Sequence, residues 1–170
     1  MTLVNLSTSK GDITIEVDEN LCPITAKNFL DYCAQGFYEN TIFHRVIDKF
    51  MVQGGGMTPD LIPKPTNEQI INEAALGLKN VIGTVAMART NNPHSATCQF
   101  FINVADNSFL DFKSANESGF GYCAFAKVVG GMDVINAIAQ SNTVNKGHHQ
   151  DVPEDDIVIL KATIDQPAYA

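Results

Sequence analysis

A histidine, an arginine and a glutamine interrupt the apolar stretch T-I-F-H-R-V-I-D-K-F-M-V-Q-G-G-G at residues 41–56. They are His44, Arg45 and Gln53, and the residues around them are mostly the aromatic and β-branched types that favour strands. A guanidinium is costly to bury in such surroundings without a partner. Arg45 is therefore either paired for stability, for example with Asp48, or directed at a ligand. In the second case it supplies a hydrogen-bond donor that stays charged without titrating.

The spacing within this stretch indicates two strands that meet at a tight corner at residues 48–49. Arg45 and Gln53 are eight residues apart, so strand parity alone places them on one face, although the corner weakens that inference. His44 points to the face opposite its neighbour Arg45, and we interpret it as structural because no acid–base step requires it. The glycines at 54–56 allow a sharp turn, whereas a phosphate loop is disfavoured because no Lys-Ser/Thr pair follows.

Metal and thiol chemistry have little support in the sequence. His148, His149 and Asp151 suggest a metal site, but adjacent histidines rarely converge on one ion in an extended chain, so we predict none. None of the four cysteines forms a C-x-x-C pair or has zinc spacing to a histidine. We expect reduced thiols packed as small apolar groups, with a disulfide still open and Cys98 partly accessible.

Length and composition suit one domain spanning residues 1–170, with 45% hydrophobic and 18% charged residues. The formal charge of −8 argues against a nucleic-acid partner, which would require clustered Lys and Arg. No tract is long enough to span a bilayer, and the N-terminus lacks the features of a signal peptide. We therefore expect a cytoplasmic protein with no membrane partner, and a monomer.

The apolar pattern predicts about eight short strands and two helices, with few long helices between strands. This favours a mainly antiparallel β fold over a parallel α/β sheet, but does not distinguish a closed barrel from a sandwich. The elements are predicted as a hairpin over residues 3–17, helices over 23–35 and 132–140, strands over 81–88, 99–104, 122–129 and 157–164, an irregular segment over 55–80 and a polar loop over 141–154.

The pattern F-H-R-V-I-x-x-F-M-x-Q-G-G resembles the signature of the cyclophilins, which are peptidyl-prolyl cis–trans isomerases. The resemblance continues in G-T-V-A-M-A-R at residues 83–89, in S-x-x-x-Q-F-F-I at 95–102, and in later blocks up to residue 129. The G-H-H-Q-D-V-P segment near the C-terminus is similar to bacterial members in particular. The resemblance implies a closed eight-stranded antiparallel barrel capped by two helices. It also implies a rotamase that acts on X–Pro bonds of peptides and of unfolded or folding proteins, without a cofactor.

Carried over residue by residue, the resemblance makes Arg45 and Gln53 catalytic. Phe109 stands where well-studied eukaryotic members have Trp, which implies weakened affinity for cyclosporin because an indole N–H donor is lost. Arg89 replaces an Asn found in many members, and we expect its side chain to matter little if this position acts through its backbone. The implied substrate-binding residues are Phe50, Met51, Ala88, Arg89, Thr90, Gln99, Phe101, Phe109, Leu110 and Tyr122.

The implied reaction explains why these residue types are needed. Resonance makes rotation about the peptide bond slow, and the two X–Pro isomers differ little in energy, so only the barrier has to fall. In the twisted state the prolyl nitrogen regains a lone pair, which a fixed donor can meet. Shortening about 100 s to about 1 ms requires about 7 kcal/mol, whereas one charge-assisted hydrogen bond supplies about 1.5–3 kcal/mol. An apolar pocket must therefore also hold the ring.

Other readings of the same residues remain open. Phe50, Met51, Phe101 and Leu110 could all be ordinary core, and the glutamines could each satisfy buried backbone groups. A non-catalytic chaperone or adaptor that only binds proline-containing segments is the main alternative. A carrier that holds a small ligand inside the barrel is a second one, which the content of large apolar residues disfavours.

Overall fold

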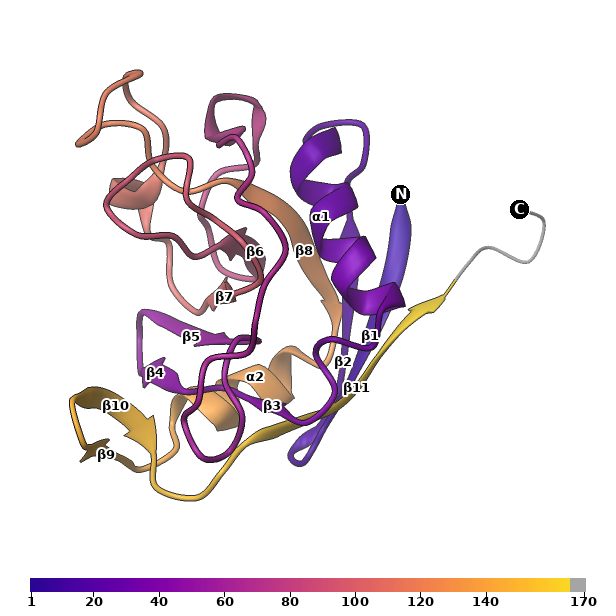
Figure 1. Ribbon diagram of the computed structural model, residues 1–170, viewed down its shortest axis with the longest axis vertical. Coiled ribbons are helices and arrows are strands. Elements are labelled where there is room, and N and C mark those ends of the chain that lie inside the picture. Colours follow the sequence, from indigo (N-terminus) through magenta and orange to yellow (C-terminus); the bar gives the residue numbers. More distant parts are fainter. Residues whose placement is uncertain (166–170) are drawn as a thin grey trace.

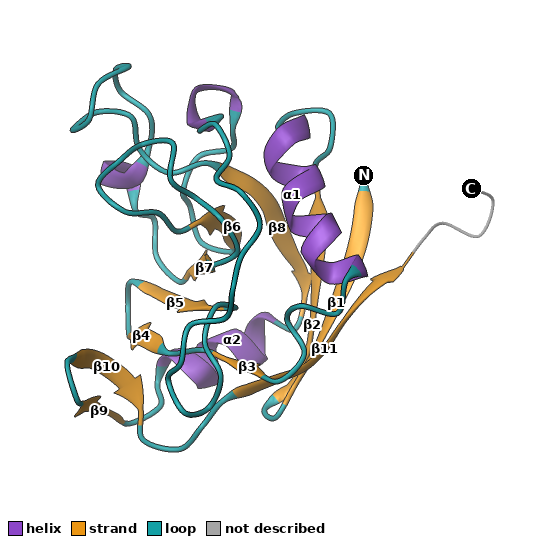
Figure 2. Ribbon diagram, viewed as in Figure 1, coloured by secondary structure: helices purple, strands orange, loops and turns teal. Residues whose placement is uncertain are grey.

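The computed structural model describes residues 1–165, and within this range nine strands form one curled antiparallel sheet (Figures 1 and 2). The strand order is β3-β11-β1-β2-β8-β6-β7-β5-β4. The strands of this sheet are β1 (Thr2–Thr8), β2 (Gly11–Val17), β3 (Thr41–Ile42), β4 (Arg45–Ile47), β5 (Met51–Gly54), β6 (Thr84–Met87), β7 (Phe100–Asn103), β8 (Ala124–Gly130) and β11 (Val158–Asp165).

Two helices accompany the sheet in the described range, α1 (Pro23–Ala34) and α2 (Met132–Ala139), as the sequence predicted. Figure 1 shows α1 toward the top and α2 toward the bottom of the sheet. Pro23 occupies the first turn of α1, and Ala26, Phe29 and Cys33 form its buried face. Short 3₁₀ turns, η1 (Ala74–Leu76) and η2 (Ser108–Leu110), interrupt the long loops.

The two edges of the sheet, β3 and β4, do not meet as neighbouring strands would in the expected closed eight-stranded barrel. Its edge strands β3 and β4 follow each other in the chain, separated by Phe43 and His44. The segment after β5 bonds back to β3, because Gly55 N–H donates to Ile42 O at 3.3 Å and Ile42 N–H donates to Met57 O at 3.0 Å. The mainly antiparallel β fold is confirmed, while the described residues contain nine strands in the sheet and a closure made by loop hydrogen bonds.

The interior of the curled sheet is filled by aromatic side chains. Phe29 packs against Tyr38, Phe100 and Phe125 with ring centroids 5.2–5.5 Å apart, and all four rings are fully buried. The prediction that large apolar residues fill the interior is confirmed, which removes the support for a small-ligand carrier. A second, smaller cluster lies near the surface and contains Met51, Ala86, Phe101, Leu110 and Ala124.

The expected polar loop over residues 141–154 is wrong. This segment forms a separate hairpin of β9 (Thr143–Lys146) and β10 (His149–Pro153), which packs beside β4 (Figure 1). The expected accessibility of Cys98 is also wrong, because that side chain is 1% exposed. All four cysteines are buried, in agreement with the expectation that they pack as small apolar groups. Among the described residues, no helix is long and apolar enough to cross a membrane.

Candidate active site

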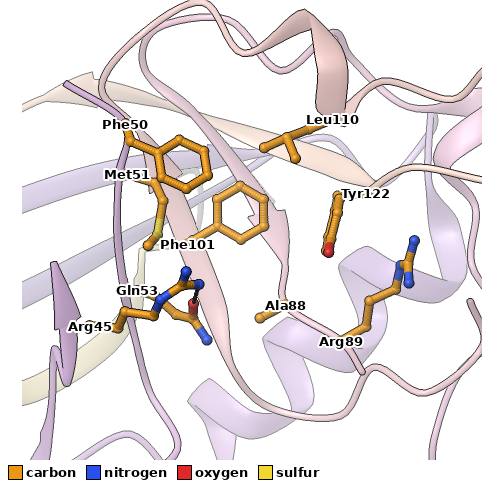
Figure 3. Close-up of a pocket in the computed structure, with 9 residues that line it drawn as sticks. All are labelled: Arg45, Phe50, Met51, Gln53, Ala88, Arg89, Phe101, Leu110 and Tyr122. Carbon is orange, nitrogen blue, oxygen red and sulfur yellow. Dashed lines mark hydrogen bonds between the residues drawn. The ribbon is translucent and has the colours of Figure 1, made fainter. Parts of the chain in front are cut away.

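Arg45 and Gln53 lie directly opposite each other in the β4–β5 hairpin, so they share one face of the sheet. Arg45 is exposed, and its Nη1 donates to Gln53 Oε1 at 3.3 Å (Figure 3). Gln53 Nε2 in turn donates to Gln99 Oε1 at 3.0 Å. The salt bridges of the described residues join Lys27 to Asp31 and Lys127 to Glu16, so Arg45 is not paired with Asp48. The two glutamines therefore orient the guanidinium at the surface.

An apolar pocket of about 120 Å³ opens beside this guanidinium. Phe101 from β7 forms its floor, and Phe50, Leu110 and Tyr122 stand around the floor on different sides (Figure 3). Phe101, Met51 and Leu110 are 5%, 2% and 9% exposed, so they pack as core residues and also line the pocket. The full lining is Arg45, Phe50, Met51, Gln53, Ala88, Arg89, Phe101, Leu110 and Tyr122.

A second pocket of about 170 Å³, which is lined mostly by polar side chains, adjoins the first along Gln53, Ala88 and Arg89. The sequence analysis selected Thr90 and Gln99 from its lining but missed Ser95 and Thr97. The S-x-x-x-Q-F-F-I block contains both missed residues, and it was the available signal for them. Ser95 Oγ accepts hydrogen bonds from Thr90 N at 2.9 Å and from Thr90 Oγ1 at 2.8 Å, so it shapes this wall.

The side chain of Arg89 braces the wall formed by Tyr122. Its guanidinium carbon lies 4.4 Å from the centre of the Tyr122 ring, and its Nε donates to Gly121 O at 3.0 Å. The other side of Tyr122 meets Phe101 edge-on, with centroids 5.7 Å apart. Tyr122 therefore stands between Phe101 and Arg89 (Figure 3). We expected the side chain at position 89 to matter little, and these contacts give it a structural role instead.

Phe109 lies outside the pocket lining, although the sequence analysis included it in the site. Its ring is 62% exposed and stacks on Phe50 at a centroid distance of 5.8 Å and an interplanar angle of 29°. The pair extends the apolar surface beyond the rim of the pocket. The structure thus places Phe109 next to the site through Phe50 alone.

His44 is buried on the face opposite Arg45, at 6% exposure, as the sequence predicted. Burial lowers its pKa to about 4, and electrostatic interactions with His149 and Arg45 act in the same direction. A neutral, buried ring suits a structural residue. At the hairpin, the rings of His148 and His149 stack 4.2 Å apart, and the described residues contain no group of three potential metal ligands.

The curled antiparallel sheet presents a pocket with a phenylalanine floor beside a surface arginine, which is the arrangement that the resemblance to the proline isomerases implied. The chain matches the model of the "Cyclophilin type peptidyl-prolyl cis-trans isomerase/CLD" family over residues 3–164, and it therefore belongs to this family.

Relatives from several organisms agree with this assignment. The chain is 55% identical over 164 residues to peptidyl-prolyl cis-trans isomerase B of Escherichia coli (strain K12), an alignment that covers 96% of this chain and 100% of that protein. It is 52% identical over 163 residues to peptidyl-prolyl cis-trans isomerase A of Dickeya dadantii (strain 3937), covering 96% and 84%. The enzyme is thus a peptidyl-prolyl cis–trans isomerase.

Solved structures give the same fold. A cyclophilin type peptidyl-prolyl cis-trans isomerase of Cryptosporidium parvum, crystallised in the presence of the dipeptide Ala-Pro, superimposes with a TM-score of 0.81 at 29% sequence identity. The match covers 97% of this chain and 99% of that chain.

Proposed function

We propose that this isomerase accelerates X–Pro rotation non-covalently, with Arg45 donating a hydrogen bond to the prolyl nitrogen of the twisted state. The observation that carries the proposal is the position of the guanidinium, which is exposed at the mouth of the apolar pocket and hydrogen-bonded to Gln53. A donor in this position meets a lone pair that exists only in mid-rotation, so it stabilises the twisted state more than either planar state.

The pocket supplies the other part of the catalytic effect. In this proposal the prolyl ring rests on Phe101, between Phe50 and Leu110, while the residue before proline runs along the backbone of Ala88, Arg89 and Thr90 toward the second pocket. Gln53 and Gln99 hold the guanidinium and face the substrate backbone. Holding the ring still while the flanking chain turns converts binding energy into a lower barrier.

The substrates that fit this site are proline-containing peptides and unfolded or folding proteins. The structure of the Cryptosporidium relative obtained with the dipeptide Ala-Pro supports this choice. We further propose a cytoplasmic monomer whose affinity for cyclosporin is weakened, because Phe109 provides no side-chain hydrogen-bond donor where an indole would.

Replacement of Arg45 tests the mechanism against a protein that only binds proline-containing segments. We expect Arg45→Ala to lower kcat for an Ala-Pro test peptide by about 10- to 100-fold, the equivalent of one charge-assisted hydrogen bond. KM should change little, because the donor acts only in the twisted state. Isomerisation kinetics, together with a thermal melt that shows an intact fold, measure this effect.

Lys127→Ala is the matched control, because it removes another surface cation on β8, where Lys127 pairs with Glu16. It should leave kcat unchanged. Equal rates for Arg45→Ala and the parent would exclude the proposed role of Arg45. A parent enzyme that binds the peptide but does not isomerise it would favour the adaptor.

A further inference from the structure

Three buried asparagines form a chain of amide hydrogen bonds beneath the apolar pocket. Asn80, Asn103 and Asn107 are 1%, 0% and 4% exposed. Asn107 Nδ2 donates to Asn103 Oδ1 at 2.8 Å, and Asn103 Nδ2 donates to Asn80 Oδ1 at 3.1 Å. We call these three residues the amide network. It is a feature that the sequence analysis did not single out and that the reaction mechanism above does not use.

The two ends of the amide network bind the main chain of three pocket residues. At one end, Asn107 Nδ2 also donates to Phe50 O at 3.0 Å. At the other end, the two hydrogens of Asn80 Nδ2 are shared among three acceptors, Leu110 O at 3.3 Å, Tyr122 O at 3.2 Å and Asp111 Oδ1 at 3.1 Å. Phe50, Leu110 and Tyr122 stand around the floor of the pocket on different sides (Figure 3). One connected set of amides thus reaches three separate walls.

These three walls lie outside the strands of the sheet. Phe50 is in the corner between β4 and β5, Leu110 ends η2, and Tyr122 precedes β8. The floor needs less support, because Met51 and Phe101 belong to the paired strands β5 and β7. Within β7, Asn103 lies opposite Met51. The amide network therefore connects the rigid ladder under the floor to the loops that form the walls.

Asn80 has further contacts that fix its own position. Its backbone N–H donates to Asp111 Oδ1 at 2.7 Å, and its carbonyl accepts from Asn107 N–H at 2.8 Å. Asn103 Nδ2 also donates to Thr84 Oγ1 of β6 at 3.0 Å. An amide with this many partners is held in one orientation, and it transmits that orientation to the carbonyls that it binds.

We propose that the amide network positions the prolyl pocket: it holds the loop walls at the spacing that grips a proline ring. Asn80, Asn103 and Asn107 are positioning residues, because they act through the main chain of the wall residues and do not line the pocket themselves. The inference rests on the proposed function for the identity of the ring in the pocket. Loss of the network loosens the walls but leaves the floor, Arg45 and the two glutamines in place, so it should weaken substrate binding more than turnover.

Asn107→Leu tests this proposal, because it keeps the branched shape of the side chain and removes the two hydrogen bonds that Asn107 Nδ2 donates, to Phe50 O and to Asn103 Oδ1. We expect KM for an Ala-Pro peptide, and the Kd from direct peptide titration, to rise about tenfold, which corresponds to about 1.4 kcal/mol. We expect kcat to stay within about threefold of the parent value. Arg45→Ala has the opposite signature, a fall in kcat at nearly constant KM.

If Asn107 contributes only to stability, Asn107→Leu should affect KM no more than the loss of any other buried hydrogen bond does. Thr8→Val is the matched control: Thr8 is 6% exposed and its Oγ1 donates to Gly11 O at 2.6 Å in the β1–β2 turn, which contributes nothing to either pocket. Both variants should lower the Tm, but Thr8→Val should leave KM within about twofold of the parent value.

Asn107→Ala is the second variant if Asn107→Leu does not fold, since it removes the same donors without the risk of overpacking. Unchanged KM and Kd in a folded Asn107 variant would overturn the proposal, whatever its Tm. If KM and Kd are unchanged in the Asn107 variant while Arg45→Ala lowers kcat, the positioning role fails but the proposed mechanism of Arg45 is retained. An inactive parent would instead count against the function itself.

Discussion

His44 precedes Arg45 in the chain, but its side chain is buried whereas Arg45 is exposed. Its ring is buried at 6% exposure, and among the described residues its Nδ1 is the one buried side-chain nitrogen or oxygen without a hydrogen-bond partner. Burial, followed by electrostatic interactions with His149 and Arg45, lowers its pKa to about 4 from an ordinary value of 6.5. The folded state therefore keeps this ring neutral under conditions in which an unfolded chain protonates it.

This difference predicts acid sensitivity. Because the folded pKa lies below the unfolded pKa, the contribution to stability is complete above about pH 6.5 and is lost as the pH falls toward 4. Between pH 7 and pH 4.5 the loss amounts to about 2 kcal/mol, at about 1.4 kcal/mol per pH unit. Urea unfolding at the two pH values should show this loss in the parent and a loss smaller by that amount in His44→Gln. The same pH dependence in both proteins would contradict the assignment.

Most residues that line the two pockets could be named from the sequence, because they fall in the separate blocks that resemble the cyclophilins. Arg45 and Gln53 could be placed on one face by parity, and the register of the hairpin confirms this. The stacking of Arg89 on Tyr122 was not predictable, because the two residues are far apart in the chain and meet only after folding. The amide network was hidden for the same reason, since an asparagine in a sequence looks the same whether it is solvated or bridges two buried carbonyls.

At the scale of elements, apolar periodicity predicted both helices and the main strands, and failed where strands carry little apolar surface. In the hairpin of β9 and β10, only Val152 and Pro153 are buried, and Thr143, Val144 and Asn145 are exposed. A strand without a buried face leaves no alternation to detect. The remaining signal was local: Gly147 has φ 61° and starts the two-residue turn between the strands.

Gly83 and Gly131 have similar positive φ angles but different surroundings. Alanine variants at these two positions therefore distinguish the cost of backbone strain from the cost of a steric clash with the added Cβ. Gly131 precedes α2 with φ 84°, and a Cβ there would overlap the carbonyl oxygen of Asp12. Gly83 precedes β6 with φ 88°, and a Cβ there would meet nothing within 4 Å. We expect Gly83→Ala to lower the free energy of unfolding by about 1 kcal/mol through strain alone.

Gly131→Ala should cost about 3 kcal/mol, because displacement of the β2 backbone adds to the same strain. Urea unfolding of the two variants gives the difference directly. An equal loss of the free energy of unfolding in both variants would mean that the backbone at the junction of α2 and β2 can shift with little loss of stability. That result would contradict the close packing of α2 on β2 seen in the structure.

At the scale of the whole molecule, the four thiols report whether the core opens as a unit. Cys22, Cys33, Cys98 and Cys123 are 0%, 5%, 1% and 4% exposed, and they come from three parts of the chain, since Cys22 and Cys33 lie at the two ends of α1. Burial raises the pKa of Cys33 to about 12, and it also raises that of Cys98. Cys123 Sγ lies 3.5 Å from Cys22 Sγ, which joins the start of α1 to the segment before β8.

We therefore expect a thiol reagent at pH 8 to modify almost none of the four cysteines in the folded protein and all four after unfolding in urea. The rate in the native state should fall when the protein is stabilised, because modification requires opening of the core. Counting the modified thiols by mass spectrometry checks this. Rapid modification of a single cysteine in the native state would show that its part of the core opens independently.

The position of β11 affects how the protein is made. This last strand is inserted between β3 and β1, which both come from the first quarter of the chain. The flanks of β1 and β3 therefore stay unpaired until residues 158–165 have been synthesised and have left the ribosome exit tunnel. Completion of the sheet must be a late event in biosynthesis, and during translation the exposed flanks of β1 and β3 are the surfaces on which a nascent-chain chaperone would be needed.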